Sequence, residues 1–414
     1  MSIPQGLRSI AAALPCPLYL VGGYVRNLLL YGKTDTDMDI CAALPVEELR
    51  RALEGLPCEV QDVNPRVGTV LIKWGDERYE YTTFRRDSYP IGGVHTPAQV
   101  TFVGSPAEDA LRRDFCANAI YLDVATGEII DPTGGREDLK KGVLRATREP
   151  DLVFGEDGLR ILRLVRFCAQ LGFVPDEETF LSAQRHCHYL RDITPERIWG
   201  EMRLILLSDT RYNVPFGHEK GLALLDRLGA WPYIAPLDAP CTTEGCLRYF
   251  PQDLTLRLAG LTRCLALQTG AERIDFAIRM LGRDGWRCSN TILNEVECLL
   301  RAEQASLYSE ADWRIWAATY RENSERVGYL WNDAPKAKYA VETWHAIRDK
   351  HIPLSHKDLP LSPADLCRMG IPSKLLGKVY QAVLLYCWTH LLRPTKQRCT
   401  VLVRNAYKEK KWNR

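Results

Sequence analysis

The chain of 414 residues lacks three features that often reveal a protein class directly. It has no apolar run of about 18 residues, so the sequence predicts no membrane-spanning helix. Its formal net charge is only +2, so any basic surface for nucleic acid has to be local. Its 14 cysteines form no CxxC pair, the spacing that structural zinc sites commonly use.

The cysteines and histidines point to reduced thiols rather than to a metal centre. Most cysteines stand among apolar residues, as Cys168 and Cys387 do, and free cysteine is among the most buried residue types. The nearest approaches to metal spacing are the run HCH at 186–188 and the pair Cys241 and Cys246, and the histidines have no second ligand cluster nearby. We therefore expect no zinc and a reducing compartment.

Residues 9–23, SIAAALPCPLYLVGG, superficially resemble a signal peptide. Pro15 and Pro17 interrupt the apolar run, which leads straight into a Gly-Gly turn. We expect this segment to be folded and the protein to be cytoplasmic.

The composition, 46% apolar and 26% charged, is that of an ordinary globular protein, and the pattern changes near residue 150. Before that point, short runs typical of strands alternate with turns and with helical segments at 24–32 and 105–115, where Ser105 is a candidate N-cap. After it, helical periodicity prevails. The sequence thus predicts an α+β fold: a head with a mixed sheet and helices at 1–145, followed by an all-helical remainder. The predicted strands are at 18–23, 38–44, 68–74, 78–84 and 118–124, and the first three helices of the remainder at 156–173, 175–190 and 194–208.

An acidic stretch, YGKTDTDMDIC at 31–41, raises the first question of function. In a strand, the carboxylates of Asp35, Asp37 and Asp39 point to the same face, where they repel one another unless the face is wet or holds a cation. About ten residues earlier, LVGGYVRN places Gly22 and Gly23 between a strand and a helix, whose first N–H groups form an anion site. Arg26, one turn into that helix, can reach the same anion. A phosphate site beside carboxylate-bound Mg²⁺ is what nucleotidyl transfer needs.

Two arginine-rich stretches follow. LRRDFCANAI at 111–120 combines Arg112 and Arg113 with Asp114 and Asn118. EDGLRILRLVRF at 156–167 places four charged residues at steps of three, which form an oblique ridge along a helix. The positions between them are apolar, so little of this helix is free to face water. The four residues are Asp157, Arg160, Arg163 and Arg166.

These motifs, in this order, resemble the class II tRNA nucleotidyltransferase (CCA-adding enzyme) and bacterial poly(A) polymerase family. LVGGYVRN…DMDI is similar to its metal-binding motif, RRDFCANAI to its ribose-recognition motif, and EDGLRILRLVRF to its base-reading motif. DPTGGREDLKKGVLRA at 131–146 resembles the connection from head to neck, and TPERIWGEM at 194–202 the next neck helix. Residues 361–384 resemble the tail more faintly. The resemblance implies a nucleotidyltransferase head at 1–145, a base-reading neck at 146–210, a helical body at 211–330 and an RNA-binding tail at 331–414.

The resemblance also implies the partners and the site. The enzyme would use CTP and ATP with Mg²⁺ to add or repair the CCA at the 3′ end of tRNA. Asp37 and Asp39 would be the catalytic metal ligands, Asp35 a solvated bystander, and Glu80 a third catalytic carboxylate. Asp157 and Arg160 would read the edge that C and A share, as acceptor and donor. The implied nucleotide-binding residues are Gly22, Gly23, Arg26, Arg112, Arg113, Asp114, Asn118, Asp157, Arg160, Arg163 and Arg166.

Two departures and three alternatives stay open. Asn27 stands where the family commonly has an aspartate, which predicts a looser helix turn, and Val94 stands where an arginine often precedes the histidine of the family's mobile loop. That loop is implied in the switch from C to A addition, so Val94 bears on the terminal A. The chain could instead be a poly(A) polymerase or an enzyme that adds only CC or only A. It could also be a catalytically silent RNA-binding relative, or a small-molecule nucleotidyltransferase, although that group usually has Gly-Ser and lacks the arginine-rich neck.

Overall fold

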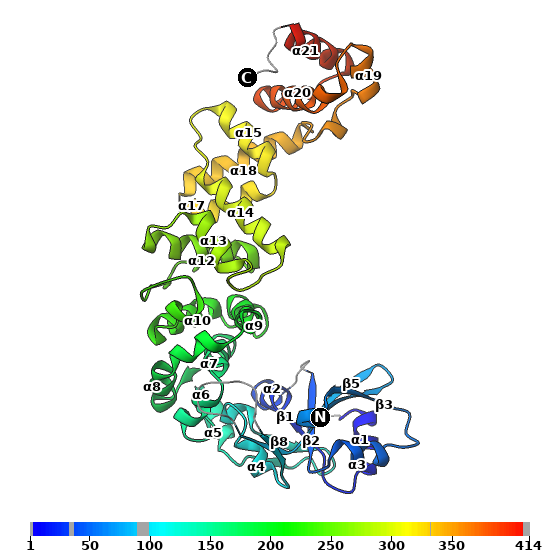
Figure 1. Cartoon of the computed structure of the whole chain (residues 1–414), viewed down its shortest axis with the longest axis vertical. Helices are drawn as coiled ribbons and strands as arrows, with labels where there is room; N and C mark the ends of the chain where they lie inside the picture. The colour runs from blue at the N-terminus through cyan, green and yellow to red at the C-terminus, as the bar shows by residue number, and fades with distance from the viewer. Residues whose placement is uncertain (1–2, 33–36, 89–98, 332, 409–414) are drawn as a thin grey trace. The chain divides into compact units, whose positions relative to one another are not determined.

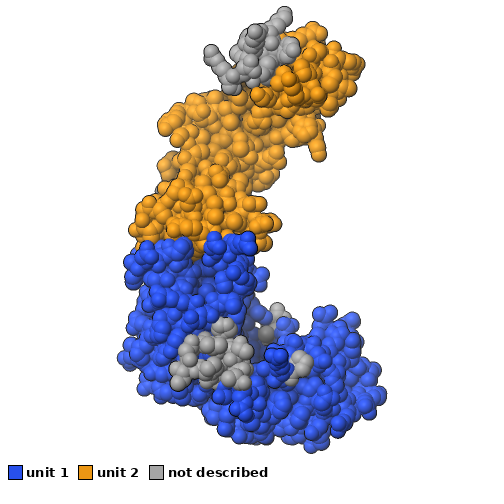
Figure 2. All heavy atoms as spheres, viewed as in Figure 1, with its two compact units in different colours: residues 1–248, 283–287 blue, residues 249–282, 288–414 orange. Residues whose placement is uncertain are grey.

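A computed structural model describes residues 3–32, 37–88, 99–331 and 333–408 of the chain. The chain divides into two compact units (Figure 2). The first comprises residues 1–248 and 283–287, and the second comprises residues 249–282 and 288–414. Asp35 and Val94, on which two of the expectations above depend, lie outside the described residues.

The first unit begins with a seven-stranded sheet in the order β3-β4-β5-β2-β1-β8-β9, seen in blue and cyan in Figure 1. Only β2 and β5 run parallel; the other neighbours in this sheet are antiparallel. A separate two-stranded ribbon pairs β6 with β7. The strands of the head are β1 Tyr19–Val21, β2 Met38–Ala42, β3 Glu59–Asn64, β4 Thr69–Trp74, β5 Glu77–Thr83, β6 Arg85–Ser88, β7 Gln99–Phe102, β8 Tyr121–Asp123 and β9 Ile129–Ile130.

Aromatic side chains fill part of the head's core. Tyr19 on β1 stacks on Phe84 at 5.8 Å between ring centroids, and both rings meet Tyr121 of β8 edge-on. These contacts join the middle of the sheet to the strand that follows the first arginine-rich stretch, residues 111–120. The helices of the head are α1 Gln5–Ala13, α2 Gly23–Tyr31, α3 Val46–Ala52, α4 Pro106–Ala110 and α5 Gly135–Lys141, with a 3₁₀ turn, η2, at Cys116–Asn118.

The rest of the first unit is almost entirely helical. A short parallel pair, β10 Val143–Leu144 and β11 Val174–Pro175, ties the start of this region to the turn after α7. Residues 283–287 return to this unit, where the indole N–H of Trp286 donates to the Ile234 carbonyl oxygen at 2.5 Å. The helices are α6 Pro150–Glu156, α7 Leu159–Leu171, α8 Glu177–Arg185, α9 Pro195–Leu206, α10 Gly217–Leu228 and α11 Trp231–Ile234, with 3₁₀ segments η3 Cys187–Asp192 and η4 Ser208–Thr210.

The second unit contains only helices and connecting segments among its described residues. Its core includes Trp316, whose indole N–H donates to the Ala302 carbonyl oxygen and whose ring lies 5.2 Å from that of Trp331. The helices are α12 Leu254–Thr269, α13 Arg273–Leu281, α14 Asn290–Gln304, α15 Glu310–Tyr320, α16 Asn323–Arg326, α17 Gly328–Trp331, α18 Ala334–Asp349, α19 Pro363–Arg368, α20 Leu376–His390 and α21 Lys396–Lys408.

The predicted α+β head with a helical remainder is confirmed. Ser105 caps α4 by accepting a hydrogen bond from the Glu108 N–H, but the helix predicted over 105–115 ends at Ala110. Tertiary contacts stop it, because the Cys116 N–H donates to the Arg145 carbonyl oxygen and Phe115 bridges to Ala146. The division into four parts stays a prediction.

All 14 cysteines are free thiols, and Cys168 and Cys387 are buried as expected. Of the helices that the structure describes, none combines the length and the apolar character needed to cross a membrane.

Candidate active site

The Gly-Gly turn forms as the sequence predicts. Strand β1 ends at Val21, Gly22 is the N-cap, and α2 begins at Gly23. Gly22 has φ +75°, a conformation that favours glycine, and a Cβ there would stand 3.2 Å from Oδ2 of Asp39. Glycine at this position therefore lets the helix start approach the carboxylate on the next strand.

The strand carboxylates lie at the same place in the sheet. Asp39 on β2 is in register with Val21 on β1 and with Glu80 on the parallel strand β5. Residues in register point to the same face, so Asp39 and Glu80 are neighbours, and both are exposed. Asp37, also exposed, immediately precedes β2. The carboxylate of Asp39 faces a pocket whose walls limit its hydration. This loss of solvation, and next the negative charge of Glu80, raise the pKa of Asp39 to about 6.

Carboxylate oxygens are the ligands that hard cations such as Mg²⁺ prefer, so the donor chemistry at Asp37 and Asp39 fits such a cation. In the described part of the chain, no three histidine, cysteine or acidic side chains converge closely enough to hold a metal ion by themselves. Mg²⁺ commonly uses one or two protein carboxylates and completes its shell with water and substrate phosphates. Two carboxylates beside an anion site are therefore a sufficient protein contribution.

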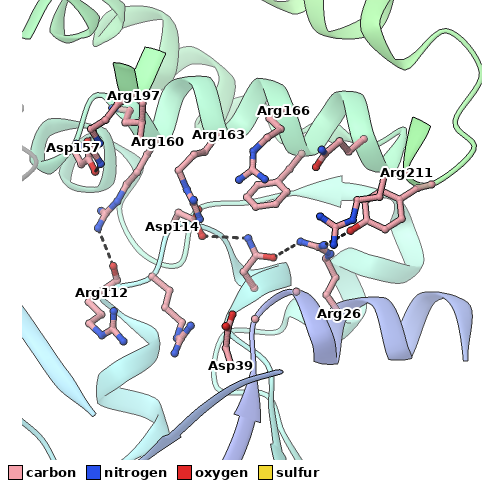
Figure 3. A pocket seen from close by; sticks show the side chains of 18 residues that line it. Arg26, Asp39, Arg112, Asp114, Asp157, Arg160, Arg163, Arg166, Arg197 and Arg211 are labelled. Atoms are coloured by element: carbon pink, nitrogen blue, oxygen red, sulfur yellow. Dashed lines mark hydrogen bonds and ion pairs between the residues drawn. The ribbon is translucent and has the colours of Figure 1, made fainter. Parts of the chain in front are cut away.

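A pocket of about 420 Å³ opens beside Asp39 (Figure 3). Twelve of the fourteen site residues predicted from the sequence line it; Asp37 and Glu80 do not. Eight arginines and three aspartates face this space, an excess of positive charge that suits a polyphosphate. The lining residues are Gly22, Gly23, Arg26, Asp39, Arg112, Arg113, Asp114, Asn118, Asp157, Leu159, Arg160, Arg163, Arg166, Phe167, Gln170, Arg197, Arg211 and Tyr212.

Asp109 organises the first pair of arginines from behind the pocket. Its side chain is fully buried and accepts hydrogen bonds from Nε of Arg112 at 2.7 Å and Nε of Arg113 at 3.0 Å. The hydroxyl of Tyr121 donates to it at 2.9 Å. Burial alone would raise the pKa of Asp109, but the two guanidinium groups outweigh it and hold the pKa at about 2. The carboxylate is thus a fixed counter-charge, and the sequence analysis missed it because a lone aspartate in a helix carries no motif.

A chain of hydrogen bonds joins α2 of the head to α7. Asp114 accepts from Nε of Arg163 at 2.7 Å and from Nδ2 of Asn118 at 3.3 Å. The Oδ1 of Asn118 accepts in turn from Nη1 of Arg26 at 2.7 Å. Asp114 is buried, which by itself would raise its pKa, yet the Arg163 guanidinium holds the pKa at about 2. Four predicted site residues from three motifs therefore form one connected network.

The base-reading motif differs from the predicted helical ridge at its first residue. Helix α7 begins at Leu159, so Asp157 lies before it in extended conformation. The carboxylate of Asp157 accepts from the Leu159 N–H at 3.0 Å and from Nη2 of Arg197 at 3.3 Å. The expectation that α7 has little free surface is confirmed, since 11 of its 13 residues are buried.

Arg160 is fixed against the wall of the pocket. Its guanidinium donates to the Val153 carbonyl oxygen at 3.0 Å and to the Arg112 carbonyl oxygen at 2.9 Å, and it pairs with Glu156 at 3.2 Å. Arg160 therefore also ties α7 to the arginine motif of the head. Whether Asp157 and Arg160 read a base stays a prediction.

Three guanidinium groups converge on one aromatic ring. The Cζ atoms of Arg26, Arg163 and Arg166 lie 5.1, 5.4 and 4.1 Å from the centroid of Phe167. Each gains a cation–π contact, but like charges this close repel one another. Burial lowers the pKa of Arg166, and Glu201, at 2.7 Å from its Nε, opposes that shift. Such a cluster is poised to bind an anion.

Several pocket residues were missed by the sequence analysis. Arg197 lies in the quoted stretch TPERIWGEM and could have been found by asking which residue pairs with Asp157. Arg211 and Tyr212 follow η4 in a connecting segment with no periodicity or motif. The predicted loosening at Asn27 is wrong: its Oδ1 accepts from Nε and Nη2 of Arg26, at 3.1 and 2.9 Å, and its Nδ2 donates to the Tyr212 hydroxyl at 3.0 Å.

Comparison with known proteins gives consistent results. A family model of the poly A polymerase head domain matches residues 18–145, and a model described as the probable RNA and SrmB-binding site of polymerase A matches residues 172–237. The chain is 38% identical over 345 residues to a CCA-adding enzyme of Streptococcus uberis, covering 80% of each chain. It is 35% identical over 282 residues to a CCA-adding enzyme of Streptococcus pneumoniae, covering 68% of this chain and 66% of that relative's length.

Among solved structures, the Bacillus stearothermophilus CCA-adding enzyme in complex with CTP superposes with a TM-score of 0.78. The two chains are 25% identical, and the alignment covers 100% of both. Two further structures, described as a Thermotoga maritima CCA-adding enzyme complexed with tRNA and a tRNA nucleotidyltransferase complexed with a primer tRNA and an ATP analogue, share the fold at TM-scores of 0.64 and 0.58.

Proposed function

Because the chain belongs to the class II CCA-adding enzyme and poly(A) polymerase family, we propose that it adds or repairs the 3′-terminal CCA of tRNA from CTP and ATP without a nucleic-acid template. One observation carries the proposal: Asp39 stands beside the Gly22–Gly23 turn at an arginine-rich pocket of about 420 Å³. The pocket combines a cation site, an anion site and groups suited to a base edge. Membership of the nucleotidyltransferase family indicates a reaction that depends on a divalent metal.

Asp37 and Asp39 are the residues that would hold Mg²⁺, with Glu80 beside Asp39 in the sheet. When bound there, Mg²⁺ would neutralise charge on the triphosphate and lower the pKa of the tRNA 3′-hydroxyl. The protein's own contribution is positional. Gly22 lets the first amides of α2 approach Asp39, so that the carboxylates and an anion-binding helix start face the same space.

In this proposal the nucleotide binds in the pocket that the residues labelled in Figure 3 surround. Gly22 and Gly23 with the arginines around Phe167 bind the triphosphate, and Arg112 and Arg113, held by Asp109, add positive charge. Asp114 and Asn118 bind the ribose.

Asp157 and Arg160 select the base. Arg160 donates to the ring nitrogen that C and A share as an acceptor, while Asp157 accepts from the amine beside it. U and G present the reverse pattern, so donor would face donor and acceptor would face acceptor.

The RNA lies along the helical part and the basic end of the chain, where residues 394–414 carry seven Lys or Arg against one acid. Phosphate contacts there bind without reading sequence. The reduced thiols and the tRNA substrate support a cytoplasmic location.

The deciding experiment incubates the protein with tRNA lacking CCA and with each nucleoside triphosphate in turn, and sequences the RNA ends. Addition of CC from CTP, and of one A when ATP is also present, supports the proposal. Long A tails from ATP alone would instead identify a poly(A) polymerase, and stopping at CC would identify a partial enzyme. A catalytically silent RNA-binding relative would bind the RNA and leave its ends unchanged.

A further inference from the structure

Arg211 and Tyr212 form one end of the pocket, and no sequence motif accounts for them. Figure 3 shows Arg211 and Arg26 at one side of the pocket and Asp157, Arg160 and Arg197 at the other, with Asp39 and Asp114 between. If the base binds at Asp157 and Arg160 and the ribose at Asp114, the α-phosphate comes near Asp39. The outer phosphates then extend toward Arg26 and Arg211.

The charges of the pocket support the same direction. Six of its eight arginines pair with a carboxylate: Arg112 and Arg113 with Asp109, Arg160 with Glu156, Arg163 with Asp114, Arg166 with Glu201 and Arg197 with Asp157. In the part of the chain that the structure describes, Arg26 and Arg211 have no such ion pair. Both uncompensated charges therefore lie at the end opposite the base-reading residues.

Tyr212 fixes this end to the head. Its hydroxyl accepts hydrogen bonds from Nδ2 of Asn27 at 3.0 Å and from Nη2 of Arg26 at 3.4 Å. Its ring stacks on Tyr31 of α2, with centroids 5.8 Å apart and an interplanar angle of 16°. The Arg211 guanidinium lies over the ring of Tyr212, with its Cζ 5.5 Å from the ring centroid. Tyr212 thus holds both arginines at one place.

Asn27 keeps the positive charge of this end uncompensated. Its Oδ1 accepts from Nε and Nη2 of Arg26 and orients that group without neutralising it. A carboxylate at position 27 would form an ion pair with Arg26 instead. An amide here orients Arg26 and leaves its charge for a bound anion.

We propose that Arg211 binds the outer phosphates of the nucleoside triphosphate together with Arg26, and that Tyr212 and Asn27 are positioning residues for this pair. The proposal rests on the proposed function. In that reaction the RNA 3′-oxygen bonds to the α-phosphorus, and the bond to the α,β-bridging oxygen breaks. The electron pair leaves with pyrophosphate, and the hydroxyl proton passes to solvent. Arg211 therefore holds the group that becomes pyrophosphate.

The test measures the binding of CTP, CMP and pyrophosphate to the whole chain by calorimetry, in buffer with Mg²⁺ and without RNA. In Arg211→Gln, affinity for CTP and pyrophosphate falls about 5-fold, a modest loss because Arg211 is exposed and water screens its charge. Affinity for CMP stays within about 2-fold. Arg203→Gln, an exposed arginine of α9 outside the pocket, is the matched control and changes none of the three.

Tyr212→Phe tests the positioning role. It removes the acceptor shared by Asn27 and Arg26 but keeps the ring on Tyr31, so pyrophosphate binding weakens about 3-fold with CMP unchanged. Asn27→Asp weakens pyrophosphate binding as well, because the new carboxylate competes for Arg26. A purely structural role would instead lower the melting temperature and weaken CMP and CTP equally.

Two results would overturn the assignment of Arg211. One is unchanged pyrophosphate affinity in Arg211→Gln. The other is a raised KM for tRNA alone, which would place an RNA phosphate, not the triphosphate, at this arginine. If the wild-type chain bound pyrophosphate but added no nucleotide to tRNA, the proposed function would fail while the phosphate site stood.

Discussion

The carboxylate side of the pocket and its arginine side differ in how firmly the protein holds their functional groups. On the carboxylate side, Asp39 of β2 lines the pocket, with Asp37 just before it in the chain and Glu80 beside it on β5. All three residues are exposed, and Asp39 and Glu80 are neighbours of like charge on the central strands of the sheet. The arginines of α7 are instead tied to other groups, as Arg163 is to Asp114 and Arg166 to Glu201. The neighbouring carboxylates therefore repel one another, whereas the ion pairs of the α7 arginines offset much of the repulsion between their positive charges.

The difference indicates what each side binds. Exposed carboxylates with few protein contacts suit a hydrated cation that supplies its own charge and shell. Guanidinium groups held by hydrogen bonds lose little freedom when a ligand arrives, which favours discrimination between similar ligands. The carboxylate side should therefore control the rate and the arginine side the choice of nucleotide, and the following variants test that division.

The largest effect is expected at Asp39. Asp39→Asn should lower kcat at least 100-fold, because in the proposed mechanism it removes a charge that holds the metal, and a bound metal stabilises the transition state by several kcal/mol. The melting temperature should stay the same or rise slightly, since one of two neighbouring like charges is lost. Asp76→Asn, in the exposed turn between β4 and β5, is the control and should leave kcat unchanged. Near-normal activity in Asp39→Asn, or in Asp37→Ala, would refute the metal assignment.

Asp157 should control selectivity more than rate. In Asp157→Ala the ratio of kcat/KM for CTP over UTP should fall by about 5- to 160-fold, because the variant removes one mismatched buried pair, which costs about 1–3 kcal/mol. Arg197→Gln distinguishes base selection by Asp157 from the ion pair that Asp157 forms with Arg197. The variant removes the arginine and keeps the Asp157 carboxylate. If the ratio is unchanged in folded Asp157→Ala, base selection resides elsewhere.

The ion pair between buried Asp114 and partly exposed Arg163 should make the first unit sensitive to acid. Because the pKa of Asp114 is lowered to about 2, its contribution to stability is present above its usual pKa and is lost as the pH falls from about 4 to 2. Asp114→Asn should lack this acid-dependent step and be less stable at neutral pH by about 1–2 kcal/mol, since the guanidinium is left unpaired. Denaturant unfolding at several pH values measures both. Glu342→Gln, in an exposed pair with Lys338, is the control and should cost less than about 0.5 kcal/mol.

The smallest effect is expected at the basic end of the chain. Deleting residues 394–414 would test its RNA contacts, but it would also remove α21, whose Cys399 and Val403 are buried. Exchange of the exposed Arg398 and Arg404 for glutamine avoids that damage. Each lost phosphate contact should reduce the slope of log affinity for tRNA against log salt by roughly 0.7–0.9. An unchanged slope would exclude these two arginines from the RNA interface.

The sequence by itself determined the groups whose chemistry depends on spacing along one segment. Gly22, Gly23 and Arg26 were singled out because a strand, a tight turn and a helix start form an anion site. The acidic stretch beside them predicted a cation, and resemblance to the family chose Asp37 and Asp39 among its three aspartates. The α+β head and the helical remainder followed from the change of periodicity near residue 150. These are local properties, set by backbone geometry and by the alternation of apolar and polar side chains.

Only the tertiary structure decided how the segments meet. Asp109 is a lone aspartate in sequence, yet it fixes Arg112 and Arg113 because folding buries it beneath both. From the sequence, Asn27 predicted a looser helix turn. In the structure its side-chain amide donates a hydrogen bond to the hydroxyl of Tyr212, 185 residues further along the chain. Arg211 could not be identified from the neighbouring sequence. It stands out only because the structure shows that most other arginines of the pocket, from distant segments, form ion pairs and that Arg211 forms none with the described residues. Burial, and ion pairing between remote residues, depend on contacts among segments that lie far apart in the chain. No local sequence pattern therefore predicts them.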